Sequence, residues 1–484
     1  MFILLFLERK LSCNLYESKV EYEMLERNDI SNKNKMLFWV VLSLIFWMPA
    51  AWRNSFATTC GQLFGYIVIG YLIIKGLNER RLEIPRSNAY LFGVVCFWII
   101  ISMFDSFRFY SEYGTLSGET TFTAPLGSIY FHLFYVALFV GYIGLVKDRT
   151  DVENTLHKGF NTIIWIQIIV GVIQLLIIFG VPGIGSVYDR INILGMMPTA
   201  SFIKEMSRIT MTGSEPATMG ASVGMLSLPY LLAVLQSTNS DREKIACFLK
   251  LVALIVLSYF SKSTTLFAII AVSAASFVIW SFRKGGISKR KTILWIVVIL
   301  TCGILTVISS FGGKLHFDSG VFEEIRYYLL VKPTDSANMS TMHRLSPTVN
   351  DIEIIKKHSI LGVGDGNQGF TYGQNVPSFM LINPKSKNFA KGIGGVVNGG
   401  AWFWAVFSGY GIVGLLALFI WYINNYRHKI KMLQNANDFL YGLYVFALPA
   451  VIITLLTGAM EPIIVFILSI PLWEPAQENQ NREE

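Results

Sequence analysis

The feature that most constrains the fold is a succession of apolar runs that are nearly free of charged residues. Most runs contain 15 to 22 residues, and a helix needs about 20 apolar residues to cross a bilayer. We therefore interpret the runs as transmembrane helices. Twelve candidate spans follow one another along the chain, at residues 37–52, 56–74, 89–104, 127–146, 160–181, 217–236, 246–260, 265–282, 292–310, 401–423, 439–457 and 459–473.

The composition indicates the same class of protein. Hydrophobic residues make up 53% of the 484 residues and charged residues 15%, whereas a soluble domain carries about 25% charged residues. The mean hydropathy is +0.50. We predict an all-α polytopic membrane protein with about 12 transmembrane helices. Because four of the runs are shorter than 18 residues, eleven or thirteen spans are the alternatives.

The distribution of Lys and Arg predicts the orientation of the spans. With twelve spans and a cytoplasmic N-terminus, the cytoplasmic segments carry 24 Lys and Arg, and the short loops on the other side carry six. Positive residues close to span ends favour the cytoplasmic side. Both termini are therefore expected in the cytoplasm. The long polar segment 311–398 is expected outside.

This topology divides the chain into five parts. The N-terminal tail lacks the features of a signal peptide, because its apolar stretch is short and no small-residue cleavage site follows. Met24 and Met36 are alternative start sites. The parts are a cytoplasmic tail at 1–36, transmembrane helices 1–9 at 37–310, a large extracytoplasmic loop at 311–398, transmembrane helices 10–12 at 399–473, and a cytoplasmic tail at 474–484.

Charge and cysteine content exclude several functions. The net charge is +8, but the basic residues are scattered over loops, so nucleic-acid binding is a poor interpretation. The five cysteines have no spacing typical of a metal site, and no pair of them suggests a disulfide. The outside loops contain no Asp-x-Asp motif and no His/Cys cluster. We expect no metal and no cofactor.

The long loop is predicted to be partly helical. Ser346 is suited to an N-cap and Pro347 to the first helical position. Apolar residues then recur at helical spacing up to His358. Gly362, Gly364 and Gly366 follow, and we interpret them as a sharp turn instead of a nucleotide-binding fingerprint, because no strand and helix flank them.

Three outside segments carry the candidate functional residues, and each has a structural alternative. Glu215-Pro216 closes the segment that begins at Arg208, and it is also an ordinary helix start. Lys262 lies in the turn Ser261–Thr264 and equally suits an interfacial anchor. His358 in the long loop also suits the C-terminal end of a helix dipole.

The order of these segments resembles the O-antigen polymerase and O-antigen ligase family of bacterial envelope glycan assembly. The likeness covers roughly residues 160–425, and its motifs are loose individually but occur in the family's order. Four pieces carry it: Arg208-Ile-Thr-Met-Thr-Gly-Ser-Glu215-Pro216, Leu257-Ser-Tyr-Phe-Ser-Lys-Ser-Thr264, Arg344 with His358-Ser-Ile-Leu-Gly362-Val-Gly364, and Asn398 with Ser408-Gly-Tyr-Gly411-Ile-Val-Gly414.

Two departures bear on the choice within the family. Ligases usually carry His directly before the Asn at the end of the loop, whereas Val397 precedes Asn398 here. This favours a polymerase, with an O-antigen ligase as the alternative. The hairpin turn often carries Arg, and here its basic residue is Lys262.

The resemblance implies a metal-independent glycosyltransferase of the bacterial cytoplasmic (inner) membrane. It would join undecaprenyl-diphosphate-linked oligosaccharide repeats of O-antigen, capsule or exopolysaccharide on the outer face of that membrane. Fixed cations would stabilise the departing lipid diphosphate in a region of low dielectric constant. Besides these lipid-linked glycans and membrane lipids, a chain-length regulator is the partner expected by analogy.

The resemblance also suggests roles for individual residues. Arg208 and Arg344 would clamp phosphate oxygens, and Lys262 would act as a point charge. Glu215 or His358 would accept the proton of the attacking hydroxyl. Further substrate contacts are expected from Arg190, Arg326 and Asn398.

Two other function classes compete with this reading. A flippase or another transporter for lipid-linked glycans fits twelve spans, but transporters commonly bind substrate at the midplane between related halves. No internal repeat is evident here, and the largest polar segment is a single loop. A scaffold or sensor would not depend on Arg208 or Arg344.

Overall fold

The computed structural model describes residues 33–46, 59–78, 86–113, 115–116, 118–146, 152–192, 197–284, 339–393 and 399–473. This part of the chain is mostly helical, with one short antiparallel pair of strands, β1 (Thr115–Leu116) and β2 (Glu119–Thr120). Residues 33–43 form a first helix. The elements that follow are α2 (Cys60–Asn78), α3 (Arg86–Tyr113), α4 (Ala124–Val146), α5 (Val152–Ile178), α6 (Ile184–Ile191), α7 (Ala200–Met206), α8 (Pro216–Ser222), the π-helix η2 (Val223–Ser227), α9 (Leu228–Ser237), α10 (Asp241–Phe260), α11 (Thr264–Lys284), α14 (Met339–Lys357), η4 (Gln368–Thr371), α15 (Tyr372–Asn375), η5 (Met380–Ile382), α16 (Pro384–Ala390), α17 (Trp402–Ala436), α18 (Asp438–Thr457), α19 (Pro462–Ser469) and η6 (Ile470–Leu472).

Seven helices of the described residues are long and apolar enough to cross a membrane. Two predicted runs form shorter apolar helices, Thr265–Phe277 and Pro462–Leu472. The predicted run 246–260 lies in α10, whose first turn is charged, and the run 292–310 lies outside the described residues. The seven long helices are Cys60–Asn78, Ala89–Glu112, Ala124–Val146, Val152–Ile178, Pro216–Ser237, Trp402–Ala436 and Asp438–Thr457.

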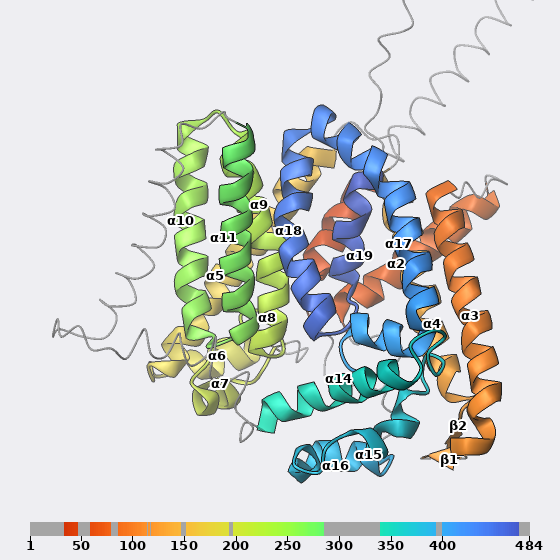
Figure 1. The fold of residues 1–484 in the computed structure, drawn as a ribbon. Helices are drawn as coiled ribbons and strands as arrows, with labels where there is room; N and C mark the ends of the chain where they lie inside the picture. Colours follow the sequence, from red (N-terminus) through yellow and green to blue (C-terminus); the bar gives the residue numbers. More distant parts are fainter. Residues whose placement is uncertain are drawn as a thin grey trace, which may run out of the picture.

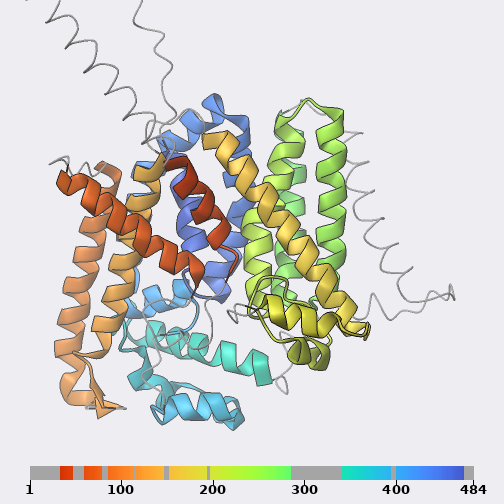
Figure 2. The same cartoon turned by 180° about the vertical axis from the view of Figure 1, so that it is seen from behind.

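The long helices run side by side, and the connections gather at the two ends of the bundle (Figures 1 and 2). One end carries α6, α7, the strand pair and the group α14 to α16. The opposite end carries the start of α10 and the junction of α17 with α18. The described segments that the charge pattern predicts to be outside thus share one end, which we call the loop end.

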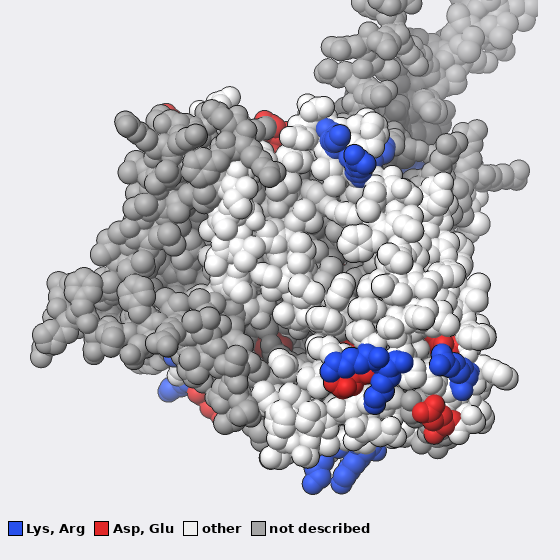
Figure 3. Space-filling view, viewed as in Figure 1, with Lys and Arg blue, Asp and Glu red and all other residues white. Residues whose placement is uncertain are grey.

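The surface of the bundle matches an apolar environment. Side chains such as Ile74, Ile100 and Phe419 are about 60% exposed or more on the outer helices. In Figure 3, a band without visible charged side chains separates charged groups near the two ends of the uncovered face. Exposed apolar surface of this extent is stable where lipid tails replace water.

The centre of the bundle is formed by the segment Pro216–Ser237 and by α18. Within its most apolar stretch this segment is 83% buried, against 33% for Cys60–Asn78. It is not a regular helix, because the π-helix η2 separates α8 from α9. A π-helical turn inserts an extra residue into the helix and often marks a functional site.

The long helix α17 is broken near its start, and the loop after α14 pairs with the break. Gly411 has φ 62° and ψ −167°, which is not helical. The freed backbone groups bond to the loop: Val363 N–H donates to Ser408 O at 3.0 Å, and Gly364 N–H donates to Gly409 O at 2.9 Å. Ile412 N–H donates in the other direction, to Ser359 O at 2.8 Å. Backbone pairing therefore fixes this part of the loop to the bundle.

The predicted sharp turn after α14 is confirmed, whereas the predicted helix start is wrong. Gly362, Gly364 and Gly366 all have positive φ, and α14 ends at Lys357. However, α14 begins at Met339, so Pro347 lies inside it. The Ser346 hydroxyl is buried and accepts a 2.6 Å bond from the Tyr372 hydroxyl. This tertiary contact takes the place of the expected cap.

Gly411→Ala should lower the free energy of unfolding by about 2 to 3 kcal/mol, because the observed φ and ψ are strained for any other residue. A Cβ at this position would also lie 2.1 Å from Ile360 O. The measurement is thermal unfolding of the purified protein in detergent. Gly93→Ala in α3 is the matched control: its added Cβ meets no atom within 4 Å, so a change of at most about 1 kcal/mol is expected. Equal losses in both variants would contradict the importance of the break.

Candidate functional site

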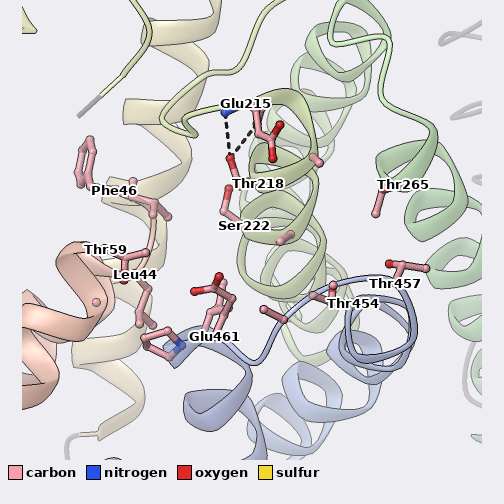
Figure 4. Close-up of a pocket in the computed structure, with 18 residues that line it drawn as sticks. Leu44, Phe46, Thr59, Glu215, Thr218, Ser222, Thr265, Thr454, Thr457 and Glu461 are labelled. Atoms are coloured by element: carbon pink, nitrogen blue, oxygen red, sulfur yellow. Dashed lines mark hydrogen bonds between the residues drawn. The ribbon is translucent and has the colours of Figure 1, made fainter. Parts of the chain in front are cut away.

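A cavity of about 290 Å³ opens between α8, α11, the turn joining α18 to α19, and the N-terminal helices. Hydroxyl side chains and two glutamates provide most of its polar groups, and no Lys, Arg or His is among the described residues that line it. Figure 4 shows these side chains projecting from several elements toward a common space. The polar members of the lining are Thr59, Glu215, Thr218, Ser222, Thr265, Thr454, Thr457 and Glu461.

Glu215 lines this cavity and is the N-cap of α8, which agrees with the helix start predicted at Glu215-Pro216. Pro216 occupies the first helical position. The Thr218 hydroxyl accepts from Glu215 N–H at 3.2 Å and donates to Glu215 O at 2.8 Å. These bonds fix the backbone of the helix start and leave Glu215 exposed at the edge of the cavity.

Glu461 enters the same cavity from the turn between α18 and α19, and the sequence reasoning missed it. It is the N-cap of α19, and Pro462 follows it at the first helical position. The chain thus places two Glu-Pro helix starts on one cavity. The repeated Glu-Pro dipeptide at the start of an apolar run was the signal that could have identified Glu461.

The environment of Glu461 differs from that of Glu215. Glu461 is partly buried, whereas Glu215 is exposed, and both line the cavity. Among the described residues, no hydrogen bond to its carboxylate is found, whereas its backbone oxygen accepts from Ile464 N–H at 2.9 Å. Burial raises the pKa of Glu461 to about 8, because a low-dielectric environment disfavours the charged form.

Arg208 contacts the turn that contains Lys262, so the structure brings these two predicted site residues together through the backbone of the turn. Arg208 donates from Nε to Ser261 O at 2.8 Å and from Nη2 to Lys262 O at 2.7 Å. Lys262 has a positive φ of 50°, so its carbonyl is turned toward the guanidinium by an unusual backbone conformation. Thr265, three residues further on, lines the cavity. Arg208 and Lys262 therefore share a turn that leads into a helix lining the cavity, although neither residue lines the cavity itself.

His358 lies elsewhere, at the end of α14. Its ring packs edge-on against Phe109 of α3, with 5.0 Å between the ring centroids. Burial and the charges of Arg108 and Lys357 lower the pKa of His358. It does not line the Glu215 cavity, so the structure separates the two residues that the sequence proposed as proton acceptors.

The other predicted site residues are placed only in part. Arg190 is exposed in the last turn of α6, at the loop end of the bundle. Arg344 lies in α14, but its side chain is outside the described part of the structure. Arg326 and Asn398 lie outside the described residues altogether.

A second group of polar residues, also missed from the sequence, surrounds Asp365 in the glycine-rich turn. Asp365 Oδ2 lies 2.7 Å from His132 Nε2 in α4 and accepts hydrogen bonds from Ser128 and, at 3.2 Å, from Tyr410. Oδ1 accepts from Gln368 at 3.2 Å. Burial alone would raise the pKa of Asp365, but His132 and these donors outweigh it, so the pKa is lowered.

Asp351 is a nearby buried carboxyl in a different state. It accepts from Gly400 N–H at 2.6 Å and from the Ser408 hydroxyl at 2.8 Å. Burial raises the pKa of Asp351 to about 7, against the effect of these two donors, and the charge of Asp365 raises it further. The turn is therefore anchored by an ionised Asp365. Its neighbour Asp351, with a pKa of about 7, is partly protonated near neutral pH.

The described ranges offer no evident metal site. No cluster of three or more His, Cys, Asp or Glu side chains is arranged there to hold a metal ion. The chemistry that the cavity offers is hydrogen bonding to hydroxyl groups and proton transfer to a carboxylate.

Comparison of the chain with protein-family models, with curated proteins and with solved structures found no match.

Asp365→Asn should destabilise the loop end strongly, by about 3 to 5 kcal/mol, because it leaves His132 without its buried partner. Asp351→Asn should cost about 1 kcal/mol, since an amide imitates the protonated carboxyl that burial favours. The measurement is thermal unfolding at pH 7 in detergent, with limited proteolysis to locate the released segment. Equal costs for the two variants would contradict the assigned charge states.

The raised pKa of Asp351 also makes the stability of the folded protein depend on pH. The pKa of Asp351 is higher in the folded protein than in the unfolded chain, so its contribution to stability is fully present at acidic pH and declines as pH rises toward about 7. Asp351→Asn should therefore flatten the loss of stability between about pH 4 and pH 7. Thermal unfolding over this range checks the expectation, and an unchanged slope would contradict it.

Proposed function

We propose that the protein is a polysaccharide polymerase that joins undecaprenyl-diphosphate-linked oligosaccharide repeats on the outer face of the bacterial cytoplasmic membrane. In this proposal the chain crosses the membrane about twelve times with both termini inside, and the loop end faces outward. The observation that carries the proposal is a polar cavity at the loop end beside the turn that holds Arg208 and Lys262.

Glycosyl transfer requires binding of the sugar and stabilisation of the departing diphosphate, and different groups of the site suit the two tasks. Hydroxyl and carboxylate groups in the cavity suit the hydroxyls of a sugar. Arg208 and Lys262 share the turn before α11, which lines the cavity through Thr265, and in this proposal the diphosphate of a membrane-embedded lipid arrives at this turn. A fixed cation stabilises the negative charge that develops on the departing diphosphate. The lipid diphosphate is itself the activated donor, so the reaction needs no nucleotide.

A transporter of lipid-linked glycans is the second candidate, and specific observations favour it. α17 is broken at Gly411, η2 interrupts the central segment, and α19 is short and begins at a buried glutamate. Interrupted helices with polar groups between them are typical of transporter binding sites. The loop end and its cations are better explained by a polymerase.

Analysis of lipid-linked glycans after loss of the protein separates the candidates. Accumulation of single repeats on the outer face supports the polymerase. Single repeats retained on the inner face indicate a flippase. Unchanged glycans would reject both, and full-length glycans that are not transferred to their final acceptor would indicate a ligase.

Arg208→Ala and Arg344→Ala should each reduce glycan lengthening by about 100-fold or more, because each removes a cation assigned to the diphosphate. Chain length is read from glycans of cells that carry each variant. Arg242→Ala, exposed in the first turn of α10 at the opposite end, is the matched control. Near-normal chain length in both site variants would reject the assignment.

Arg208 needs one further check, since it also bonds to the carbonyls of the turn. The amount of Arg208→Ala in the membrane and its unfolding temperature should stay close to those of the wild type. A large fall in either would assign Arg208 to stability instead of to the reaction.

A further inference from the structure

We propose that Glu461 is the group that accepts the proton from the attacking sugar hydroxyl, in the cavity that it shares with Glu215. The inference rests on the proposed function and makes it more specific. It replaces Glu215 and His358 as candidates for this step with a residue that the sequence interpretation had assigned only to a membrane span.

The position of Glu461 and the hydrogen bonding around it support its role as proton acceptor. Glu461 is held at the start of α19, with Pro462 fixing the backbone and the adjacent Met460 O accepting from the Tyr135 hydroxyl at 2.7 Å. Its carboxylate faces the cavity, and within the described structure no donor is bonded to it. An acceptor oxygen that is positioned yet unpaired is suited to receive a hydrogen bond from a bound hydroxyl.

The cavity also fits the size and chemistry of the acceptor. Its volume of about 290 Å³ lies at the lower limit of small-molecule pockets, which suits one sugar ring at the end of an oligosaccharide. Thr218 and Ser222 from α8 face Glu461 across the space, and Thr457 adds a hydroxyl near the turn (Figure 4). These groups can exchange hydrogen bonds with several sugar hydroxyls at once.

Glu215 is less suited to the same task. It is exposed, and it forms the cap of α8 at the cavity edge. In the present assignment Glu215 positions the acceptor sugar through hydrogen bonding.

The acceptor oxygen forms a bond to the anomeric carbon of the donor, and its O–H proton passes to the Glu461 carboxylate. The bond between the anomeric carbon and the diphosphate oxygen breaks, and its electron pair leaves with the lipid diphosphate. Glu461 then releases the proton to water at the open side of the cavity.

The rate of glycan lengthening should depend on pH through Glu461. Within the ranges that the structure describes, the titratable groups near it are Glu215 from α8, which lines the same cavity, and Tyr135 from α4. Because burial raises the pKa of Glu461 to about 8, the active deprotonated form should increase with pH up to about 8. The lengthening rate should increase in the same range and then level off.

The test uses the full-length protein in lipid vesicles with a lipid-diphosphate-linked repeat unit as substrate. Glu461→Gln should reduce the lengthening rate by about 100-fold or more and leave substrate binding within a few-fold of the wild type. Glu461→Asp should retain the increase with pH at a lower rate. Glu243→Gln, at the first turn of α10 at the opposite end, is the control for loss of a carboxylate.

Chemical rescue distinguishes a proton acceptor from a structural cap. Glu461→Ala should regain part of its activity when formate is added, because a small carboxylate fits into the vacated space. Rescue is not expected for Glu215→Ala. Absence of rescue together with an unchanged pH profile in Glu461→Gln would overturn the inference.

The outcome for the wild type separates this inference from the function on which it rests. If the wild-type protein does not lengthen the glycan, the proposed function fails. If it does so and Glu461→Gln lengthens the glycan at the wild-type rate, only the assignment of Glu461 fails.

Discussion

The interaction on which the loop end depends is the pairing of a broken helix with the chain that follows α14. A break in α17 frees the carbonyls of Ser408 and Gly409, and the glycine-rich turn supplies the donors for both. Unpaired backbone groups are costly inside a membrane protein, so a break is stable only where another segment satisfies it. The turn and the break therefore form one structural unit.

The buried carboxylate of Asp365 holds this unit in place through its hydrogen bonds. Asp365 is surrounded by donors from α4, α17 and its own turn, so one carboxylate ties together three elements. Trp98 of α3 stacks on Tyr410 with 4.7 Å between the ring centroids and packs edge-on against His132. A charge with this many partners specifies a single arrangement of the helices, because any shift would leave a buried group unsatisfied.

The same unit is connected to the cavity. Trp402 N–H, at the start of α17, donates to Gly458 O at 2.8 Å, and Gly458 lines the cavity three residues before Glu461. The start of α17 thus touches both the Asp365 network and the turn that presents Glu461. This connection gives the Asp365 network and the turn of Glu461 a common support at the start of α17.

The sequence by itself determined the class of the protein, the position of most apolar helices, the Glu215-Pro216 helix start and the sharp glycine turn. Each of these follows from local properties: the length of an apolar run, a capping residue, or the backbone freedom of glycine. Only the tertiary structure decided which polar groups are buried and which partners they have. His132 and Asp365 are 233 residues apart, and Glu461 shares a cavity with Glu215 although each belongs to a different helix start. The charge state and hydrogen bonding of a side chain depend on neighbours contributed by distant segments. For the same reason Ser346 lies inside α14 and bonds to Tyr372 instead of forming the predicted helix start.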